Sequence, residues 1–254
     1  MIWSAECRRT LRSSRVLALL ALYLLIALVV ILAAAFFWSL AAQLGETQRL
    51  VSTGGMPLPI LVAFYLSLFF LPLYVALMGF DQVSGELGPR SIRYLTVRAR
   101  RSSVLLGKFL AQTTILLGLV WLLDLGLCVY TWVTTPGFGA ADFGLNLLRF
   151  WMVSTVFSLA FLALTSFCST LTPNPAVSLL INFSALLISF LFWTTARLDE
   201  GNPLRLIRYL SPLRYSLRLL YPDAGDVAGA VVAYLVFTVL FLGGGLFILR
   251  ERDL

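Results

Sequence analysis

Six apolar runs, each long enough to cross a membrane as a helix, place the strongest constraint on the fold of this chain. They cover residues 16–38, 58–80, 104–133, 147–171, 176–196 and 227–249. An α-helix rises about 1.5 Å per residue, so about 20 apolar residues cross a hydrocarbon core of roughly 30 Å. Backbone groups cannot be left unpaired in lipid, and each run is therefore predicted to form a transmembrane helix.

Composition and charge agree with a membrane protein. The 254 residues are 60% hydrophobic and 12% charged, whereas a soluble domain carries about 25% charged residues. We predict an all-α integral membrane protein in which residues 1–254 form a single transmembrane domain with six transmembrane helices. The net charge of +7 indicates a cytoplasmic membrane face rather than nucleic acid, because Lys and Arg collect on that face.

Two segments outside the runs have amphipathic patterns. In residues 2–15, Trp3, Cys7 and Leu11 lie four apart with arginines on the opposite side. This spacing predicts an N-terminal interfacial helix, and a disordered basic tail is the alternative. In the outer segment 197–226, leucines recur every three or four residues. We expect short helices on the outer leaflet, interrupted at Ser211-Pro212.

The distribution of Lys and Arg predicts the orientation of the chain. If both termini are inside, the inner segments hold twelve of these residues and the outer segments seven. We therefore expect a multi-pass protein of a cytoplasmic (inner) membrane, with both termini cytoplasmic. The outer segment 197–226 departs from this pattern because it holds five of the seven outer arginines.

The loop 81–103, between the second and third runs, combines basic and apolar residues. Ile92 and Leu95 are three residues apart and lie among arginines. Pro89 suits the first turn of a helix, where its missing N–H needs no partner. The pattern predicts a short cytoplasmic helix at the membrane surface, against which a partner docks.

Several catalytic chemistries are excluded by the residues that the sequence lacks. The chain has no histidine, so it has no Ser-His hydrolase site, HExxH zinc site or histidine-ligated haem. Gly107-Lys108 is followed by Phe109, and no phosphate-binding loop with the G-x-x-x-x-G-K-[ST] pattern occurs. We predict a non-catalytic chain that binds no cofactor and no metal. ATP would have to be used by another chain.

A few polar residues lie inside the apolar runs. Asp124 is the only acidic residue well within a run, and an intramembrane carboxylate is a candidate functional residue. A hydrogen bond to a neighbouring helix, or protonation, is the alternative. The other candidates for a translocation path or for helix packing are Ser154, Ser158, Thr165, Ser169 and Asn182. The first four form one stripe down a helix, and small hydroxyl residues also favour close helix packing.

Several short motifs occur in the order typical of the permease subunits of type-2 ABC exporters. They are Asp81, Ser84-Gly85-Glu86, Ile92 to Thr96, Arg101-Ser102, Leu106-Gly107-Lys108-Phe109 and Tyr209 to Tyr215. With these motifs and its six runs, the chain resembles the ABC-2-type permease family over its whole length. Arg90, Arg98 and Arg100 depart from the family pattern, which indicates an unusually basic surface for a matching partner.

The resemblance implies a function and partners. Two permease copies, identical or different, would form a translocation path in membrane lipid. Two cytosolic ABC ATPase subunits would bind ATP and Mg and drive the permease through a coupling helix in the loop 81–103. The residues to which the resemblance assigns ATPase coupling are Asp81, Glu86, Pro89, Ile92, Arg93, Leu95, Arg101 and Lys108.

Two other functions are compatible with the residues. The chain could be an ion-coupled secondary carrier that uses Asp124, or a membrane assembly or anchoring protein that transports nothing. A neighbouring gene for an ATPase would favour the exporter. Transport that continues after removal of the ATPase would favour the carrier, and ATPase activity without a substrate would leave the anchoring function open.

Overall fold

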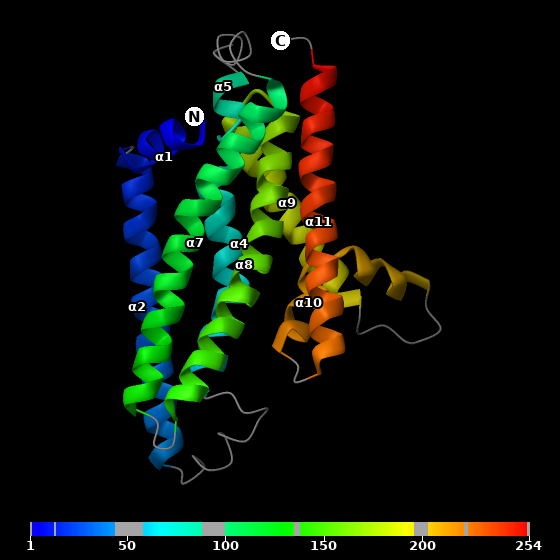
Figure 1. Ribbon diagram of the computed structural model, residues 1–254. Coiled ribbons are helices and arrows are strands. Elements are labelled where there is room, and N and C mark those ends of the chain that lie inside the picture. Colours follow the sequence, from blue (N-terminus) through cyan, green and yellow to red (C-terminus); the bar gives the residue numbers. More distant parts are fainter. Residues whose placement is uncertain are drawn as a thin grey trace.

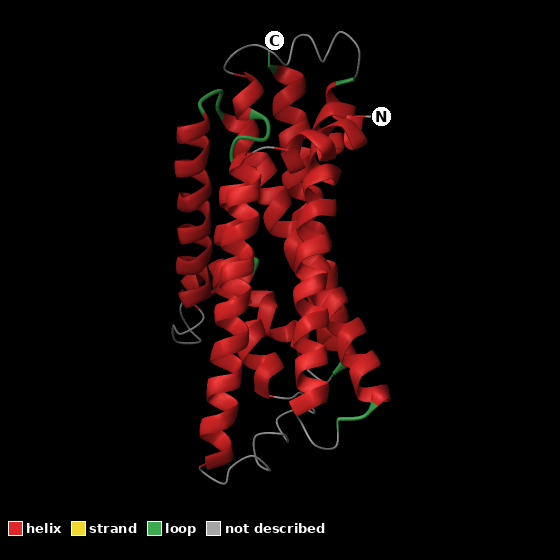
Figure 2. Ribbon diagram, turned by 90° about the vertical axis from the view of Figure 1, so that its left-hand side faces the viewer, coloured by secondary structure: helices red, strands yellow, loops and turns green. Residues whose placement is uncertain are grey.

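The computed structural model describes residues 2–12, 14–43, 58–87, 100–134, 138–195, 203–220 and 223–252. Within these residues the chain is helical and has no strand (Figure 1 and Figure 2). This confirms the predicted all-α class. The long helices are α2 (Ser14–Gln43), α4 (Leu58–Gly79), α7 (Arg101–Thr134), α8 (Ala140–Leu171), α9 (Pro175–Thr194) and α11 (Ala224–Glu251).

Five segments of the described residues are long and apolar enough to cross a membrane. They are Tyr65–Leu87, Arg101–Thr134, Ala140–Leu171, Pro175–Thr194 and Gly225–Glu251. The remaining predicted span, 16–38, lies within α2, which is a helix of 30 residues. Only some side chains of α2 belong to the described part of the structure, so the count of six spans stays a prediction.

Helix α8 occupies the centre of the bundle and contacts α4, α7, α9 and α11. Phe161 and Leu162 of α8 are fully buried, and they share one core with Val75 of α4 and Tyr234 of α11. Lipid tails are as apolar as these side chains, so close packing rather than removal from water holds such helices together. The bundle is therefore expected to be sensitive to small changes of shape at its helix contacts.

Local sequence explains where the central helices begin. Asn174 caps α9: its side chain accepts a hydrogen bond from the N–H of Ala176, and Pro175 occupies the first helical turn. Asp223 caps α11 in the same way by accepting from the N–H of Gly225. Between the long helices α8 and α9, the Asn174 cap allows a turn of only a few residues.

The N-terminal helix α1 (Ile2–Arg12) lies across one end of the bundle, where α11 also ends (Figure 1). We call this the terminal end. The indole N–H of Trp3 donates to Thr114 Oγ1 of α7 at 3.1 Å. This contact fixes α1 to α7, and the location of α1 at a membrane surface stays a prediction.

The outer segment contains η2 (Pro203–Leu210), α10 (Leu213–Ser216) and η3 (Leu217–Leu220), which meet near Ser211 and Pro212. Ser211 is fully buried and its hydroxyl donates to the carbonyl of Ser189 on α9 at 2.7 Å. The hydroxyl of Tyr234 on α11 donates to the carbonyl of Pro212 at 2.8 Å. The segment is therefore anchored between α9 and α11. The leucines spaced three or four apart are not equally exposed, because Leu206 and Leu210 are exposed whereas Leu213 and Leu217 are partly buried.

Candidate functional site

The site begins where α4 ends and the chain turns at the terminal end. A Cβ placed on Gly79 would lie 2.7 Å from Thr165 Cγ2 and 3.0 Å from Gln112 Oε1. Real Cβ atoms do not approach other heavy atoms so closely, so only glycine allows α4 to pack this tightly against α8. This contact sets the position along α8 at which α4 ends and the chain turns toward residue 84.

Two serine hydroxyls hold the turn that leads into the short helix α5 (Ser84–Leu87). Ser169 Oγ of α8 accepts from the N–H groups of Val83 and Ser84 at 2.9 and 3.0 Å, and donates to the carbonyl of Phe80 at 2.9 Å. Ser178 Oγ of α9 donates to the same carbonyl at 2.6 Å. Side-chain oxygens thus satisfy N–H groups at the start of α5, as an N-cap does.

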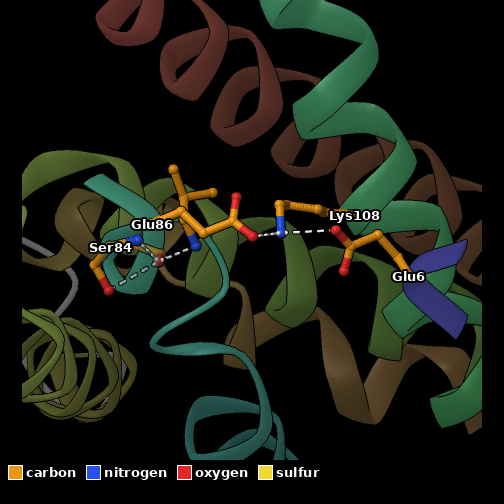
Figure 3. Close-up of polar contacts among 6 residues, drawn as sticks. Glu6, Ser84, Glu86 and Lys108 are labelled. Atoms are coloured by element: carbon orange, nitrogen blue, oxygen red, sulfur yellow. Dashed lines mark hydrogen bonds and ion pairs between the residues drawn. The ribbon is translucent and has the colours of Figure 1, made fainter. Parts of the chain in front are cut away.

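A buried ammonium joins α5 to α1 and α7 (Figure 3). Lys108 Nζ lies 2.8 Å from Glu86 Oε1 and 3.1 Å from Glu6 Oε1. Lys108 is 5% exposed and Glu86 is 7% exposed. A buried charge is tolerated when it is paired and hydrogen-bonded, and here one cation bridges two carboxylates. We call these three residues the Glu6–Lys108–Glu86 cluster.

A polar pocket of about 230 Å³ adjoins the cluster. Other residues that line it are Thr10, Asp81, Gln82, Gly85 and Gln112. The structure therefore brings together three of the residues to which the resemblance assigned coupling, Asp81, Glu86 and Lys108. Four others, Pro89, Ile92, Arg93 and Leu95, lie outside the described residues.

Arg101 lies apart from the cluster, at the start of α7. Its Nη1 donates to the carbonyls of Leu249, Arg250 and Arg252 at 2.9, 3.0 and 2.8 Å. The last carbonyls of a helix have no partner within the helix and carry partial negative charge, so a guanidinium at this place stabilises the end of α11. Arg101 thus ties α7 to α11 at the terminal end.

Glu6 was not among the residues singled out from the sequence. It is the only acidic residue in segment 2–15, among four arginines, and this isolation was the available signal. Burial raises the pKa of the neighbouring Cys7 thiol, and the Glu6 carboxylate raises it further. Glu6 therefore pairs with Lys108 of α7 and also acts on the thiol next to it in the chain.

Asp124 and Ser154, both candidates from the sequence, are hydrogen-bonded to each other. Ser154 Oγ donates to Asp124 Oδ2 at 2.7 Å, and Asp124 is 6% exposed. The bond joins α7 to α8, which corresponds to the helix-packing alternative for Asp124. The adjoining space is small, about 30 Å³, and is lined mainly by apolar side chains such as Leu71 and Phe157.

The remaining polar candidates lie within the helix packing. Thr165 packs against Gly79, and Ser169 holds the turn before α5. Ser158 and Asn182 are buried. Within the described residues, the Ser158 hydroxyl and both polar atoms of the Asn182 amide have no hydrogen-bond partner. The structure thus separates the serine stripe into individual contacts with α4, α5 and α7.

A sequence model of the ABC-2 family transporter proteins matches residues 1–254, the whole chain. The chain belongs to the ABC-2 transporter family. A comparison with curated proteins finds no match. Membership confirms the resemblance drawn from the motifs around Asp81, Glu86 and Lys108. The chain is accordingly a multi-pass membrane component of an ABC transporter, a class in which the membrane component is typically not catalytic.

Proposed function

We propose that this ABC-2 family protein is the permease subunit of an exporter driven by a separate ATPase. In this proposal the chain forms the translocation path with a second permease copy, and each copy docks one ATPase through the loop 81–103. ATP and Mg are bound by the ATPase. Family membership and the absence of a phosphate-binding loop in the sequence support this assignment.

The observation that carries the proposal is the anchoring of both ends of this loop. Glu86 comes shortly before segment 88–99 and Lys108 shortly after it, and they form an ion pair of 2.8 Å. Arg101 holds the start of α7 against α11. Because packed interiors deform little, a force applied to the loop moves the helices to which it is fixed.

The contacts also indicate which helices would move together. Lys108 connects the loop to α1, Ser169 connects it to α8, and Ser178 connects it to α9. An ATPase that closes on ATP binding would therefore displace α1, α8 and α9 together with α7. This is the mechanical step that opens or closes a path between two permease copies.

Docking is tested by adding charge to the proposed contact. Ile92→Asp combined with Leu95→Asp is expected to leave the permease in the membrane but to prevent co-purification of its ATPase, because two apolar side chains are worth roughly 3–6 kcal/mol before ordering costs. Leu206→Asp with Leu210→Asp is the matched control, since these exposed leucines belong to η2. A double variant at Ile92 and Leu95 that retains a coupled ATPase would contradict the docking role.

Orientation is tested by labelling introduced cysteines in a variant that lacks Cys7, Cys128 and Cys168. A cysteine at Ser52 should react with an impermeant reagent added to intact cells, and a cysteine at Ser102 should not. Reaction at Ser102 would overturn the proposal that both termini are cytoplasmic.

A further inference from the structure

An apolar cavity of about 520 Å³ lies between α4, α9 and α10, away from the terminal end. Phe69, Leu73, Leu187 and Leu213 are among its lining residues. Phe69, Leu73 and Leu187 are also exposed, so the cavity is open at the side of the bundle, where lipid surrounds a membrane protein. A cavity of this size and apolarity is within the range of small-molecule binding sites.

A basic group lies on the segment that forms one wall of this cavity. The guanidinium carbons of Arg208 and Arg214 lie 5.2 and 3.6 Å from the centre of the Tyr209 ring. Both arginines interact favourably with the negative face of the ring. The ring thus holds two like charges near each other, and this arrangement produces a local concentration of positive charge.

The hydrogen-bonding capacity of this group is incomplete. Arg208 Nε and Arg214 Nη1 are buried and have no acceptor among the described residues. The same part of the structure gives neither arginine a carboxylate partner, whereas Arg218 on the same segment lies 3.9 Å from Asp226. A buried N–H donor without an acceptor is unfavourable, so an anion at Arg208 and Arg214 would lower the free energy.

The two features are adjacent in the chain. Leu213, Ser216 and Leu217 line the cavity, and Arg214 directly follows Leu213. We infer that the cavity and the two arginines form one site for an anionic amphiphile, with its apolar tail between α4 and α9 and its anionic group on Arg208 and Arg214. This inference rests on the proposed function and deepens it, because it names the class of molecule that the exporter takes up from the bilayer.

Binding is tested with the permease in nanodiscs of zwitterionic lipid, using dansyl-undecanoate and its uncharged methyl ester as probes. Wild type should bind the anionic probe more tightly than the ester. Arg208→Gln with Arg214→Gln should weaken binding of the anionic probe at least about tenfold and leave the ester unaffected, because hydrogen bonds to charged groups are lost. Arg218→Gln is the matched control, since that charge already has Asp226 as a partner.

The apolar half of the site is tested by filling the cavity. Leu187→Trp should weaken both probes to a similar extent, because the tail is common to both. Equal affinity for the two probes in wild type, or an unchanged affinity in the double arginine variant, would overturn the inference.

Transport assays separate this inference from the proposed function. In proteoliposomes that contain the permease and its ATPase, the anionic probe should stimulate ATP hydrolysis and be moved across the bilayer. A probe that binds at Arg208 and Arg214 but neither stimulates nor moves identifies a resident lipid site and overturns the assignment as cargo, while the ATPase remains docked. A wild-type permease that binds the probe but does not dock an ATPase would instead contradict the proposed function.

Discussion

The Glu6–Lys108–Glu86 cluster and the pair Arg208 and Arg214 differ in how their positive charges are paired. At the terminal end, one ammonium is buried between two carboxylates of the same chain. Beside the apolar cavity, two guanidiniums share a tyrosine ring and retain donors without an acceptor in the described part of the chain. A cation held between two carboxylates makes a rigid joint between helices, whereas a cation with N–H donors left over can attract a ligand. This difference supports the proposals of force transmission at the first region and of recognition at the second.

The largest expected effect follows from removing the cation of the Glu6–Lys108–Glu86 cluster. Lys108→Met leaves two partly or fully buried carboxylates facing each other, and loss of one partner from a buried ion pair costs about 3–5 kcal/mol. We expect a markedly lower melting temperature in detergent. The triple variant that adds Glu6→Gln and Glu86→Gln should recover most of the loss, because it carries no unpaired charge. A triple variant as unstable as Lys108→Met would show that the ion pairs are not what stabilises this joint.

The second prediction concerns the close packing of Gly79 against Thr165, which positions the turn before the Glu6–Lys108–Glu86 cluster. Gly79→Ala places a methyl group against Thr165 and should destabilise the protein by about 1–3 kcal/mol, the usual effect of overpacking. Thr165→Ser removes the Cγ2 atom involved and should relieve much of the loss in the double variant. The control is Gly118→Ala, since no atom lies within 4 Å of a Cβ built there. Equal melting temperatures of the Gly79→Ala and Gly118→Ala variants would contradict the close approach.

A smaller effect is expected at Asp124, which accepts a hydrogen bond from Ser154 of α8. Asp124→Asn keeps an oxygen that can accept from Ser154, so ATP-driven transport should stay within a few-fold of wild type. Ser154→Ala should lower stability by about 0.6 kcal/mol, the average for hydrogen bonds between membrane helices. Loss of transport in Asp124→Asn at normal expression and normal ATPase docking would support the alternative of an ion-coupled carrier.

The smallest effect is a shift in the titration of Tyr209, which lies beside Arg208 and Arg214. The hydrogen bond from Arg208, followed by that from Arg214 and by the two positive charges, lowers the pKa of this phenol. Because these cations stabilise the phenolate, Arg208→Gln should raise the pKa of Tyr209. The shift is measured by ultraviolet absorbance as the difference between each protein and its Tyr209→Phe version. An unchanged pKa would mean that Arg208 does not act on the Tyr209 phenol in solution.

The class of fold was predictable because membrane helices depend on local composition. An apolar run of sufficient length must pair its backbone internally, whatever surrounds it. The short helices of the outer segment were predicted less completely. Leucine spacing alone could not show that Leu213 packs against the core while Leu206 stays exposed, because this difference depends on contacts with α9 and α11.

The candidate site was predictable only where a motif marked it. Asp81, Glu86 and Lys108 were found through the resemblance, and they lie around one pocket. The partner role of Glu6 was not predictable, because it joins residues 102 positions apart in the chain. The serine stripe of α8 was visible in the sequence, but the carbonyl and N–H partners of Ser169 become apparent only once the turn after Gly79 is in place.

The bonds from Arg101 to the end of α11 make the attachment of α7 depend on residues that are synthesised much later. The ribosome makes the start of α7 about 150 residues before the carbonyls of Leu249, Arg250 and Arg252 exist. A chain truncated ahead of Leu249 lacks these acceptors, so the contact that ties α7 to α11 cannot form. The contact between α7 and α11 therefore forms only after Arg252 has been translated.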